Sequence, residues 1–258
     1  MKPGRALQQY FKQRVIAIEA LLKKPDKKFT KEDFHELRVE IKKLRALIEL
    51  LAFCTKNFES EIIFKPVKKI FKQAGKVREI QLEKTSFNRY KTHAQVKAYL
   101  RKLHPKELKA KTNFSAAYKI APYRLAKMYA HIIPAIKKVH GSDVKKYITQ
   151  KEKEIKKLLH SKKIKSEQMH ALRSMLKEWH YNIKSLDVKT SDNAFKNVDS
   201  LQDLIGKWHD IRIIKRHLEK AVKKQLTLQT KPILEICHRL NLREQNLRKE
   251  INAERRKQ

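Results

Sequence analysis

Along most of the chain, apolar residues recur at intervals of three and four, the period of an amphipathic α-helix. The two clearest apolar stripes contain Leu37, Ile41, Leu44 and Ile48 in one segment, and Leu172, Leu176, Trp179 and Ile183 in another. Positions at this spacing share one helix face, so each stripe can be buried in a core. With 4 Gly and 7 Pro in 258 residues, there is little material for β-hairpins. The pattern therefore predicts an all-α fold.

Breaks in the periodicity delimit the expected helices of the first half. We expect helices over about 3–22, from Thr30 to about 54, over about 58–74, and from Ile80 toward residue 104 with a break near Ser86. Thr30 and the acidic Asp33 three residues later predict a capping box. Gly75 should break or bend its helix, and the polar stretch 105–114 should be a linker.

The second half has a similar organisation. Helical periodicity resumes near Ser115, breaks at 140–141, and starts again at Ser166, a predicted N-cap. Residues 192–197 are rich in turn-forming types. Helices before and after Gly206 and a terminal helical pair over about 230–255 complete the chain. We therefore predict a first half over 1–110, a second half over 111–228 and a C-terminal helical extension over 229–258.

A row of basic residues lies beside each apolar stripe. The rows contain His35, Arg38, Lys42 and Arg45 in the first half, and His170, Arg173, Lys177 and His180 in the second. At about 100° per residue these positions fall on one helix face. Each helix can thus bury its stripe while it presents cations beside it, an arrangement that suits binding of a polyanion.

A second motif repeats in the same order. Residues 70–80 read IFKQAGKVREI and residues 201–211 read LQDLIGKWHDI, which aligns Lys76 with Lys207. The glycines of these motifs are interpreted as helix punctuation. The basic and acidic pair that follows each lysine is interpreted equally as an orienting ion pair or as part of a ligand site. Two motifs repeated in order indicate duplication of a helical unit.

Charge narrows the class of partner. The chain has 63 Lys and Arg against 27 Asp and Glu, a formal net charge of +36. Such a charge implies an anionic partner, and nucleic acid, an anionic membrane surface and inorganic polyphosphate all qualify. The lysines are spread along the whole chain, which favours a folded cationic body over a basic tail.

No apolar run is long enough to span a membrane, and the first residues do not resemble a signal peptide.

Other chemistries receive little support from the sequence. The two cysteines, Cys54 and Cys237, lie in apolar helical segments and are expected to be buried free thiols, which suits the cytoplasm. The spacing of His170 and His180 does not suit a metal site, so no metal and no cofactor are expected. Residues 152–156 match the ExExK signature of triphosphate-tunnel enzymes, but that signature requires a strand and this segment is predicted to be helical. No nucleophile motif or phosphate-binding loop appears, so no catalysis is expected.

At the two His-x-x-Arg-x-x-x-Lys helices and the two Gly-Lys motifs, the chain resembles the CHAD family, the conserved histidine α-helical domain, over about residues 5–225. The resemblance implies two pseudo-symmetric four-helix bundles around a central basic cavity that binds inorganic polyphosphate without catalysis. By position it implies the ligands His35, Arg38, Lys42, Arg45, His170, Arg173 and Lys177, and we add Tyr181 and His180 on the same face and Lys76 and Lys207 from the second motif. Glu178 replaces the basic residue found at Lys43, which predicts unequal contributions from the two halves.

The expected function is therefore noncatalytic binding of inorganic polyphosphate in the cytoplasm, in association with polyphosphate granules. Nucleic-acid binding is the main alternative, because the charge permits it, although the basic rows contain few aromatic residues on which bases could stack. A polyphosphate-hydrolysing enzyme is a further alternative. Association with a membrane surface is less favoured, because the basic rows lie beside core stripes and not opposite a lipid-facing apolar face. No feature of the sequence indicates an oligomeric state.

Overall fold

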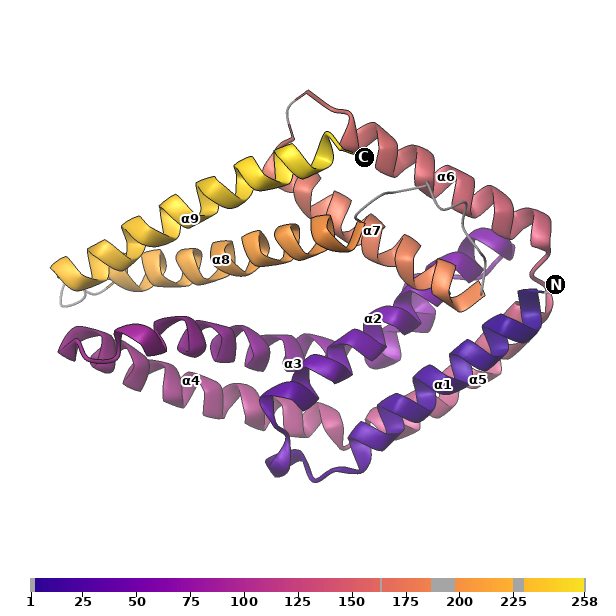
Figure 1. The fold of residues 1–258 in the computed structure, drawn as a ribbon. Helices are drawn as coiled ribbons and strands as arrows, with labels where there is room; N and C mark the ends of the chain where they lie inside the picture. Colours follow the sequence, from indigo (N-terminus) through magenta and orange to yellow (C-terminus); the bar gives the residue numbers. More distant parts are fainter. Residues whose placement is uncertain (1–2, 163, 187–197, 225–229, 258) are drawn as a thin grey trace. The chain divides into compact units, whose positions relative to one another are not determined.

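The computed structural model describes residues 3–162, 164–186, 198–224 and 230–257, and within these ranges the chain is helical without any strand. The described α-helices are α1 (Pro3–Lys23), α2 (Lys31–Cys54), α3 (Ser60–Phe87), α4 (Ala94–Tyr118), α5 (Ala121–Lys137), α6 (Gly141–Leu159), α7 (Ser166–Leu186), α8 (Val198–Lys224) and α9 (Lys231–Arg255) (Figure 1). The predicted all-α class is confirmed. None of the helices in these ranges is long and apolar enough to cross a membrane.

The helices form two compact units that are interleaved along the sequence. The first unit takes the described residues of 1–75 and 112–195, and the second those of 76–111 and 196–258. The boundaries fall inside α3 and α4, so both of these helices contribute to both units. Each unit contains helices from both halves of the predicted duplication, and the duplication itself stays a prediction.

In the first unit, α2 is the central helix and contacts α1, α5, α6 and α7, while α1 lies beside α5 (Figure 1). The predicted stripe of α2 is completely buried, from Leu37 to Ile48, and on α7 Leu172 and Leu176 are buried while Ile183 is half-buried. Apolar residues at helical spacing thus drive these helices together, as the sequence pattern predicts.

A capping box fixes the start of α2. The Thr30 side chain accepts a hydrogen bond from the backbone N–H of Asp33, and the Asp33 carboxylate accepts one from the backbone N–H of Thr30 (2.8 Å), as predicted. Lys24 at the end of the preceding segment also donates to Asp33 Oδ1 (2.6 Å). The hydrogen bond from Lys24, followed by those from Thr30, holds the pKa of Asp33 below its ordinary value although the carboxyl is buried.

This lowered pKa predicts a pH-dependent contribution of Asp33 to stability. A carboxyl whose pKa is lower in the folded state stabilises fully above its unfolded pKa of about 3.9 and loses that contribution as pH falls through the folded value. Asp33→Ala should therefore lower the free energy of unfolding at pH 7 by about 1–2 kcal/mol. In urea titrations the difference from the parent protein should shrink toward pH 3. If the free energies of unfolding of the two proteins differ equally at pH 7 and pH 3, the ionised carboxylate of Asp33 does not stabilise the capping box.

Several predicted helix boundaries are wrong, and the reason is packing. α4 continues through Pro105, where a linker was predicted, because Leu103, Ala110 and Phe114 are buried at helical spacing while Pro105 itself is exposed. The hydrogen bond that proline removes thus lies on the solvent side. α3 passes through Gly75 and α8 through Gly206 without a break, and the predicted terminal pair is the single helix α9. The predicted turn at 192–197 lies outside the described residues.

The second unit has its own core, in which α9 packs along α8 (Figure 1). The central cluster of this core contains Phe87, Val96, Tyr99, Leu103, Ile214, Leu218, Ile233 and Ile236. The C-terminal helix therefore belongs to this core.

The two cysteines, Cys54 and Cys237, are free and half-buried. Burial raises the pKa of the Cys54 thiol to about 11, and it also raises the pKa of the Cys237 thiol. Both thiols are therefore protonated at neutral pH.

Candidate functional site

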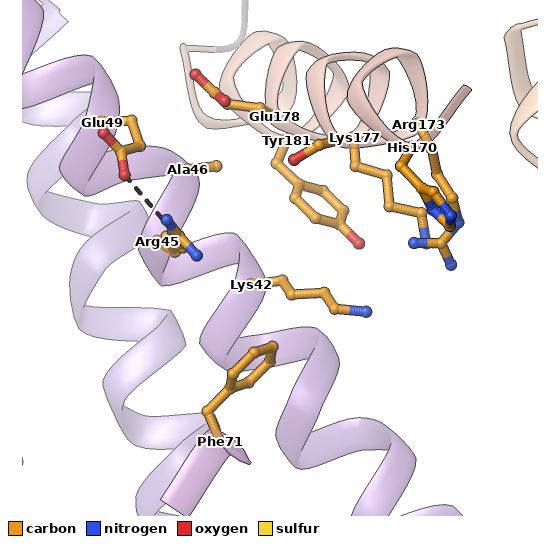
Figure 2. A pocket seen from close by; sticks show the side chains of 11 residues that line it. Lys42, Arg45, Ala46, Glu49, Phe71, His170, Arg173, Lys177, Glu178 and Tyr181 are labelled. Atoms are coloured by element: carbon orange, nitrogen blue, oxygen red, sulfur yellow. Dashed lines mark ion pairs between the residues drawn. The ribbon is translucent and has the colours of Figure 1, made fainter. Parts of the chain in front are cut away.

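A cavity of about 290 Å³ lies inside the first unit, between α2, α3 and α7. The described residues that line it are Lys42, Arg45, Ala46 and Glu49 from α2, Phe71 from α3, and His170, Arg173, Ser174, Lys177, Glu178 and Tyr181 from α7. Figure 2 shows the Lys42 side chain extending from α2 toward the side chains of α7. The cavity thus brings together basic residues from both repeated helices.

The carboxylates of the lining already have cationic or hydroxyl partners. Glu49 pairs with Arg45, with 3.5 Å between Oε1 and Nε. Glu178 pairs with Lys151 (3.0 Å) and accepts a hydrogen bond from the Tyr147 hydroxyl (2.6 Å). The lining contains four Lys and Arg side chains and a histidine against these two carboxylates. The cavity therefore favours an anion.

Tyr181 adds a neutral hydrogen-bond donor to this lining. Burial raises the pKa of its phenol, and the nearby Arg173 cation offsets only part of this effect. The hydroxyl therefore stays protonated at neutral pH and can donate to an anionic oxygen. In Figure 2 it projects from α7 into the space that the Lys42 side chain also enters.

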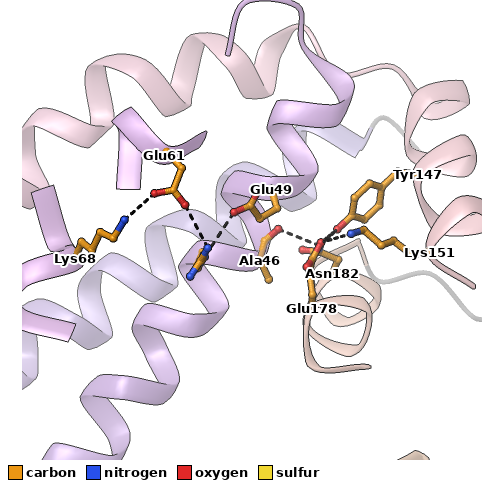
Figure 3. A network of polar contacts seen from close by, with 9 residues as sticks. Ala46, Glu49, Glu61, Lys68, Tyr147, Lys151, Glu178 and Asn182 are labelled. Carbon is orange, nitrogen blue, oxygen red and sulfur yellow. Dashed lines mark hydrogen bonds and ion pairs between the residues drawn. The ribbon is translucent and has the colours of Figure 1, made fainter. Parts of the chain in front are cut away.

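Arg45 is held at the edge of the cavity by a chain of charges. Besides Glu49 it contacts Glu61 on α3 (3.4 Å), which in turn accepts from Lys68 (2.8 Å) (Figure 3). Its guanidinium also lies over the Phe64 ring, 5.2 Å from the centroid. Because Arg45 is largely exposed, these ion pairs add little to stability, but they restrict where the guanidinium can lie.

Arg38 is directed against α3, not into the cavity. Its Nη1 donates to the backbone carbonyl of Phe71 (3.0 Å), and its guanidinium lies 4.5 Å from the centroid of the Phe71 ring. A Cβ at Gly75 would lie 2.2 Å from the same Nη1, so glycine allows the guanidinium to approach this closely, and a larger residue would shift the end of the Arg38 side chain. Gly75 thus serves helix packing, and the prediction that it punctuates the helix is wrong. Arg38 positions Phe71, which forms the cavity wall.

The other candidate residues lie elsewhere. His35 is exposed and lines a second cavity of about 550 Å³ between α1 and α2, together with Glu36, Glu40 and Lys43. His180 is half-buried with its ring 6.1 Å from that of Tyr181. Lys76 on α3 and Lys207 on α8 are exposed residues of the second unit. The cavity therefore unites Lys42, Arg45, His170, Arg173, Lys177 and Tyr181 from the predicted set.

The lining also contains five residues that were not site candidates from the sequence: Ala46, Glu49, Phe71, Ser174 and Glu178. Phe71 lies one helical turn before Gly75, and its role depends on contact with Arg38 across two helices, which no local pattern reveals. Glu49 could have been identified as the i+4 partner of Arg45. Ser174 adjoins Arg173 and adds a hydroxyl to the lining. In the described ranges, no group of three or more His, Cys, Asp or Glu side chains is arranged to hold a metal ion.

A buried polar network fixes α7 against α2 behind the cavity. Asn182 is fully buried and donates through Nδ2 to the Ala46 carbonyl (3.0 Å) and to the Tyr147 hydroxyl (2.9 Å) (Figure 3). The same Tyr147 hydroxyl donates to Glu178. The network therefore links α2, α6 and α7, the first and last of which carry Lys42 and Lys177.

Asn182→Ala should remove this link. We expect a loss of about 2–3 kcal/mol in the free energy of unfolding, because one buried amide leaves two acceptors without their donor and a small void remains. Urea unfolding followed by circular dichroism measures the loss. Lys184→Ala, an exposed change two residues along α7, is the control and should alter the free energy of unfolding by less than about 0.5 kcal/mol. Equal effects of the two substitutions would contradict a structural role for the amide.

Comparisons with known proteins agree with this fold. The CHAD domain family model matches residues 6–219. The structure resembles the crystal structure of the CHAD domain from the plant Ricinus communis, with a TM-score of 0.73 and 12% identity over 99% of this chain and 92% of that one. It also resembles PptA from Streptomyces chartreusis, with a TM-score of 0.65 and 11% identity over 99% and 97% of the two chains. No curated protein sequence matches the chain.

Proposed function

The chain belongs to the CHAD domain family, and from this premise we propose that it binds inorganic polyphosphate, without hydrolysing it, in the cavity between α2, α3 and α7. One observation carries the proposal. Side chains from both repeated basic helices line a single cavity whose two carboxylates are already paired. The cations of that cavity therefore exceed its anions, and the excess comes from two helices that belong to different halves of the sequence.

The chemistry of the lining suits a linear phosphate polymer. Arg45 and Arg173 each present a planar guanidinium that can donate to two phosphate oxygens, while Lys42 and Lys177 act as compact point charges. The Tyr181 hydroxyl donates without adding charge. Polyphosphate presents only phosphate oxygens, so a site with many donors suits it.

A nucleic-acid base would find little stacking surface in this cavity. Phe71 and Tyr181 supply the two six-membered rings of the described lining. The Phe71 ring already has the Arg38 guanidinium over it, 4.5 Å from its centroid. Proteins that bind single-stranded nucleic acid present several accessible rings along the path of the strand. The lining therefore favours polyphosphate over nucleic acid.

The same contacts support noncatalytic binding. Glu49 and Glu178 would be the carboxylates available to hold a divalent cation or to activate water, but Arg45, Lys151 and Tyr147 engage them. We propose the cytoplasm as the compartment, in association with polyphosphate granules, because the two protonated and half-buried cysteine thiols suit a reducing environment.

The proposal is tested by titration of the protein with polyphosphates of several lengths, with orthophosphate and duplex DNA as comparators at equal phosphate concentration. We expect long-chain polyphosphate to bind more tightly than DNA and to raise the melting temperature, because it binds only the folded state. Orthophosphate should have a much smaller effect. Release of orthophosphate from polyphosphate by purified protein would contradict noncatalytic binding, and tighter binding of DNA would favour the nucleic-acid alternative.

Polyphosphate affinity should rise as pH falls through about 6.5, the range in which histidine side chains gain a proton, because a charged imidazole beside phosphate strengthens binding. His170 lines the cavity and His35 does not. We therefore expect His170→Ala to flatten the pH dependence and His35→Ala to leave it nearly unchanged. The polyphosphate affinities of the parent protein and of both variants, measured between pH 5.5 and 8 at constant ionic strength, distinguish the two histidines. A pH profile that only His35→Ala alters would assign binding to the other cavity.

A further inference from the structure

The second unit contains a cavity of its own, about 570 Å³ in volume, between α3, α4 and α8. The described residues that line it are Ile80 and Glu83 from α3, Tyr99, Lys102, Leu103 and Lys106 from α4, and His217, Lys220 and Ala221 from α8. None of these residues belongs to the repeated basic rows or to the cavity of the first unit. Its volume lies within the range of small-molecule sites, roughly 300–1,000 Å³.

A buried carboxylate organises the inner wall of this cavity. Glu83 is only 1% exposed, and both of its oxygens are engaged. The Tyr99 hydroxyl donates to Oε1, and the His217 Nδ1 lies 3.0 Å from Oε2. Burial raises the pKa of Tyr99, and the charge of Glu83 adds to this effect, so the phenol stays a donor. With its Nδ1 directed to Glu83, the His217 ring can present its Nε2 to a ligand.

Cations from two helices also line this cavity. Lys102 and Lys106 are one turn apart on α4, and Lys220 is one turn from His217 on α8. All three lysines are exposed. Glu107, the acidic neighbour of Lys106, is paired with Lys84 (2.7 Å) and Lys111 (3.3 Å). The lining therefore has three lysines and a histidine against one carboxylate, and that carboxylate already has two partners.

The rest of the lining is apolar. Ile80, Leu103 and Ala221 are buried or half-buried and come from three different helices. A lining that combines apolar residues with cations suits a ligand with an anionic head and an apolar or aromatic body. Orthophosphate would leave most of the 570 Å³ unfilled. Three lysines suit a dianion better than the single charge of a carboxylate.

We infer that this cavity binds an organic phosphate, a phosphomonoester dianion attached to an apolar or aromatic group such as the nucleoside of a nucleotide. Lys102, Lys106 and Lys220 neutralise the phosphate, His217 donates to one of its oxygens, and Ile80, Leu103 and Ala221 contact the organic group. Glu83 and Tyr99 act as positioning residues, because they hold the His217 ring. This site is independent of the polyphosphate proposal, which concerns the first unit.

The test uses isothermal titration of the intact protein with adenosine monophosphate and phenyl phosphate, with orthophosphate and adenosine as the two partial ligands. We expect both phosphomonoesters to bind at least tenfold more tightly than either orthophosphate or adenosine. Equal binding of orthophosphate and the phosphomonoesters would overturn the role of the apolar lining residues. Equal binding of adenosine and its monophosphate would overturn the phosphate site. No binding of the phosphomonoesters at millimolar concentration would overturn the inference as a whole.

Matched variants assign the binding to this cavity. Lys102→Ala combined with Lys220→Ala should weaken adenosine monophosphate by at least tenfold, and Ala221→Leu should weaken it by filling the cavity. Lys223→Ala, an exposed lysine one turn from Lys220 on α8, is the control and should leave affinity unchanged. Lys42→Ala with Lys177→Ala, in the first unit, should also leave it unchanged. Phosphomonoester binding that survives the first two changes but is lost with the last would belong to the polyphosphate cavity and would refute this site.

Discussion

Lys42→Ala combined with Lys177→Ala should weaken the binding of long-chain polyphosphate on the order of a hundredfold or more. The two lysines enter one cavity from α2 and α7. A hydrogen bond between charged groups contributes about 1.5–3 kcal/mol, and each 1.4 kcal/mol is a factor of ten in affinity. Both residues lie within helices, where alanine is well tolerated, and thermal unfolding of the double variant checks that the fold is retained.

A control pair separates this local effect from general charge attraction. Lys153→Ala combined with Lys156→Ala removes the same charge from exposed positions of α6 in the same unit. We expect this pair to weaken binding only a few-fold, and more at low salt than at high salt, because exposed charges act through the screened field. Equal losses in the two double variants would mean that polyphosphate binds diffusely and that the cavity has no special role.

The second large effect concerns Arg38 and Gly75. Gly75→Ala should lower the free energy of unfolding by about 1–3 kcal/mol, although alanine favours helix over glycine by about 1 kcal/mol. The added Cβ would lie 2.2 Å from Arg38 Nη1 and would displace the guanidinium from the Phe71 carbonyl and ring. The charged hydrogen bond and the cation–π contact together outweigh the gain in helix propensity.

The sign of this effect should reverse when the arginine is absent. In an Arg38→Ala background, Gly75→Ala meets no guanidinium and should raise the free energy of unfolding by about 0.5–1 kcal/mol. A double-mutant cycle in urea measures both values. If Gly75→Ala destabilises equally in the two backgrounds, the glycine is required for a reason other than the approach of Arg38.

The sequence predicted the helices best where apolar spacing and local chemistry agree. α2 begins after the Thr30 capping box and ends at Cys54 as expected, because both the cap and the stripe are local. Prediction failed at Pro105 and Gly75, where local propensity opposes the helix. Burial of Leu103 and Phe114 outweighs the lost hydrogen bond at Pro105. The close contact with Arg38 explains why a glycine stands at position 75 within a helix. Both outcomes depend on tertiary contacts that a single helix pattern does not contain.

The residues that line the candidate cavity were largely predictable from the sequence by type. The neighbouring helix that each side chain meets was less predictable. The repeated rows indicated Lys42, Arg45, His170, Arg173 and Lys177, and these line one cavity. One helix face is broad, however, and the residues on it do not all meet the same neighbour. Arg38 meets α3, and His35 lies beside α1. Which part of a face meets which helix is fixed by packing of α2 against α1, α3 and α7, and this packing required the structure.

The division of the chain into interleaved units has a consequence for biosynthesis. Neither unit is a continuous stretch, since each needs a segment from before and a segment from after the boundary at 111–112. During translation, the first unit cannot be completed until α7 has left the ribosome, and the second cannot be completed until α9 has. The apolar stripes of the early segments therefore stay exposed until the later helices emerge, and exposed apolar surface favours aggregation. A fragment that ends at residue 110 contains neither unit, so the two sequence halves cannot be prepared as separate domains.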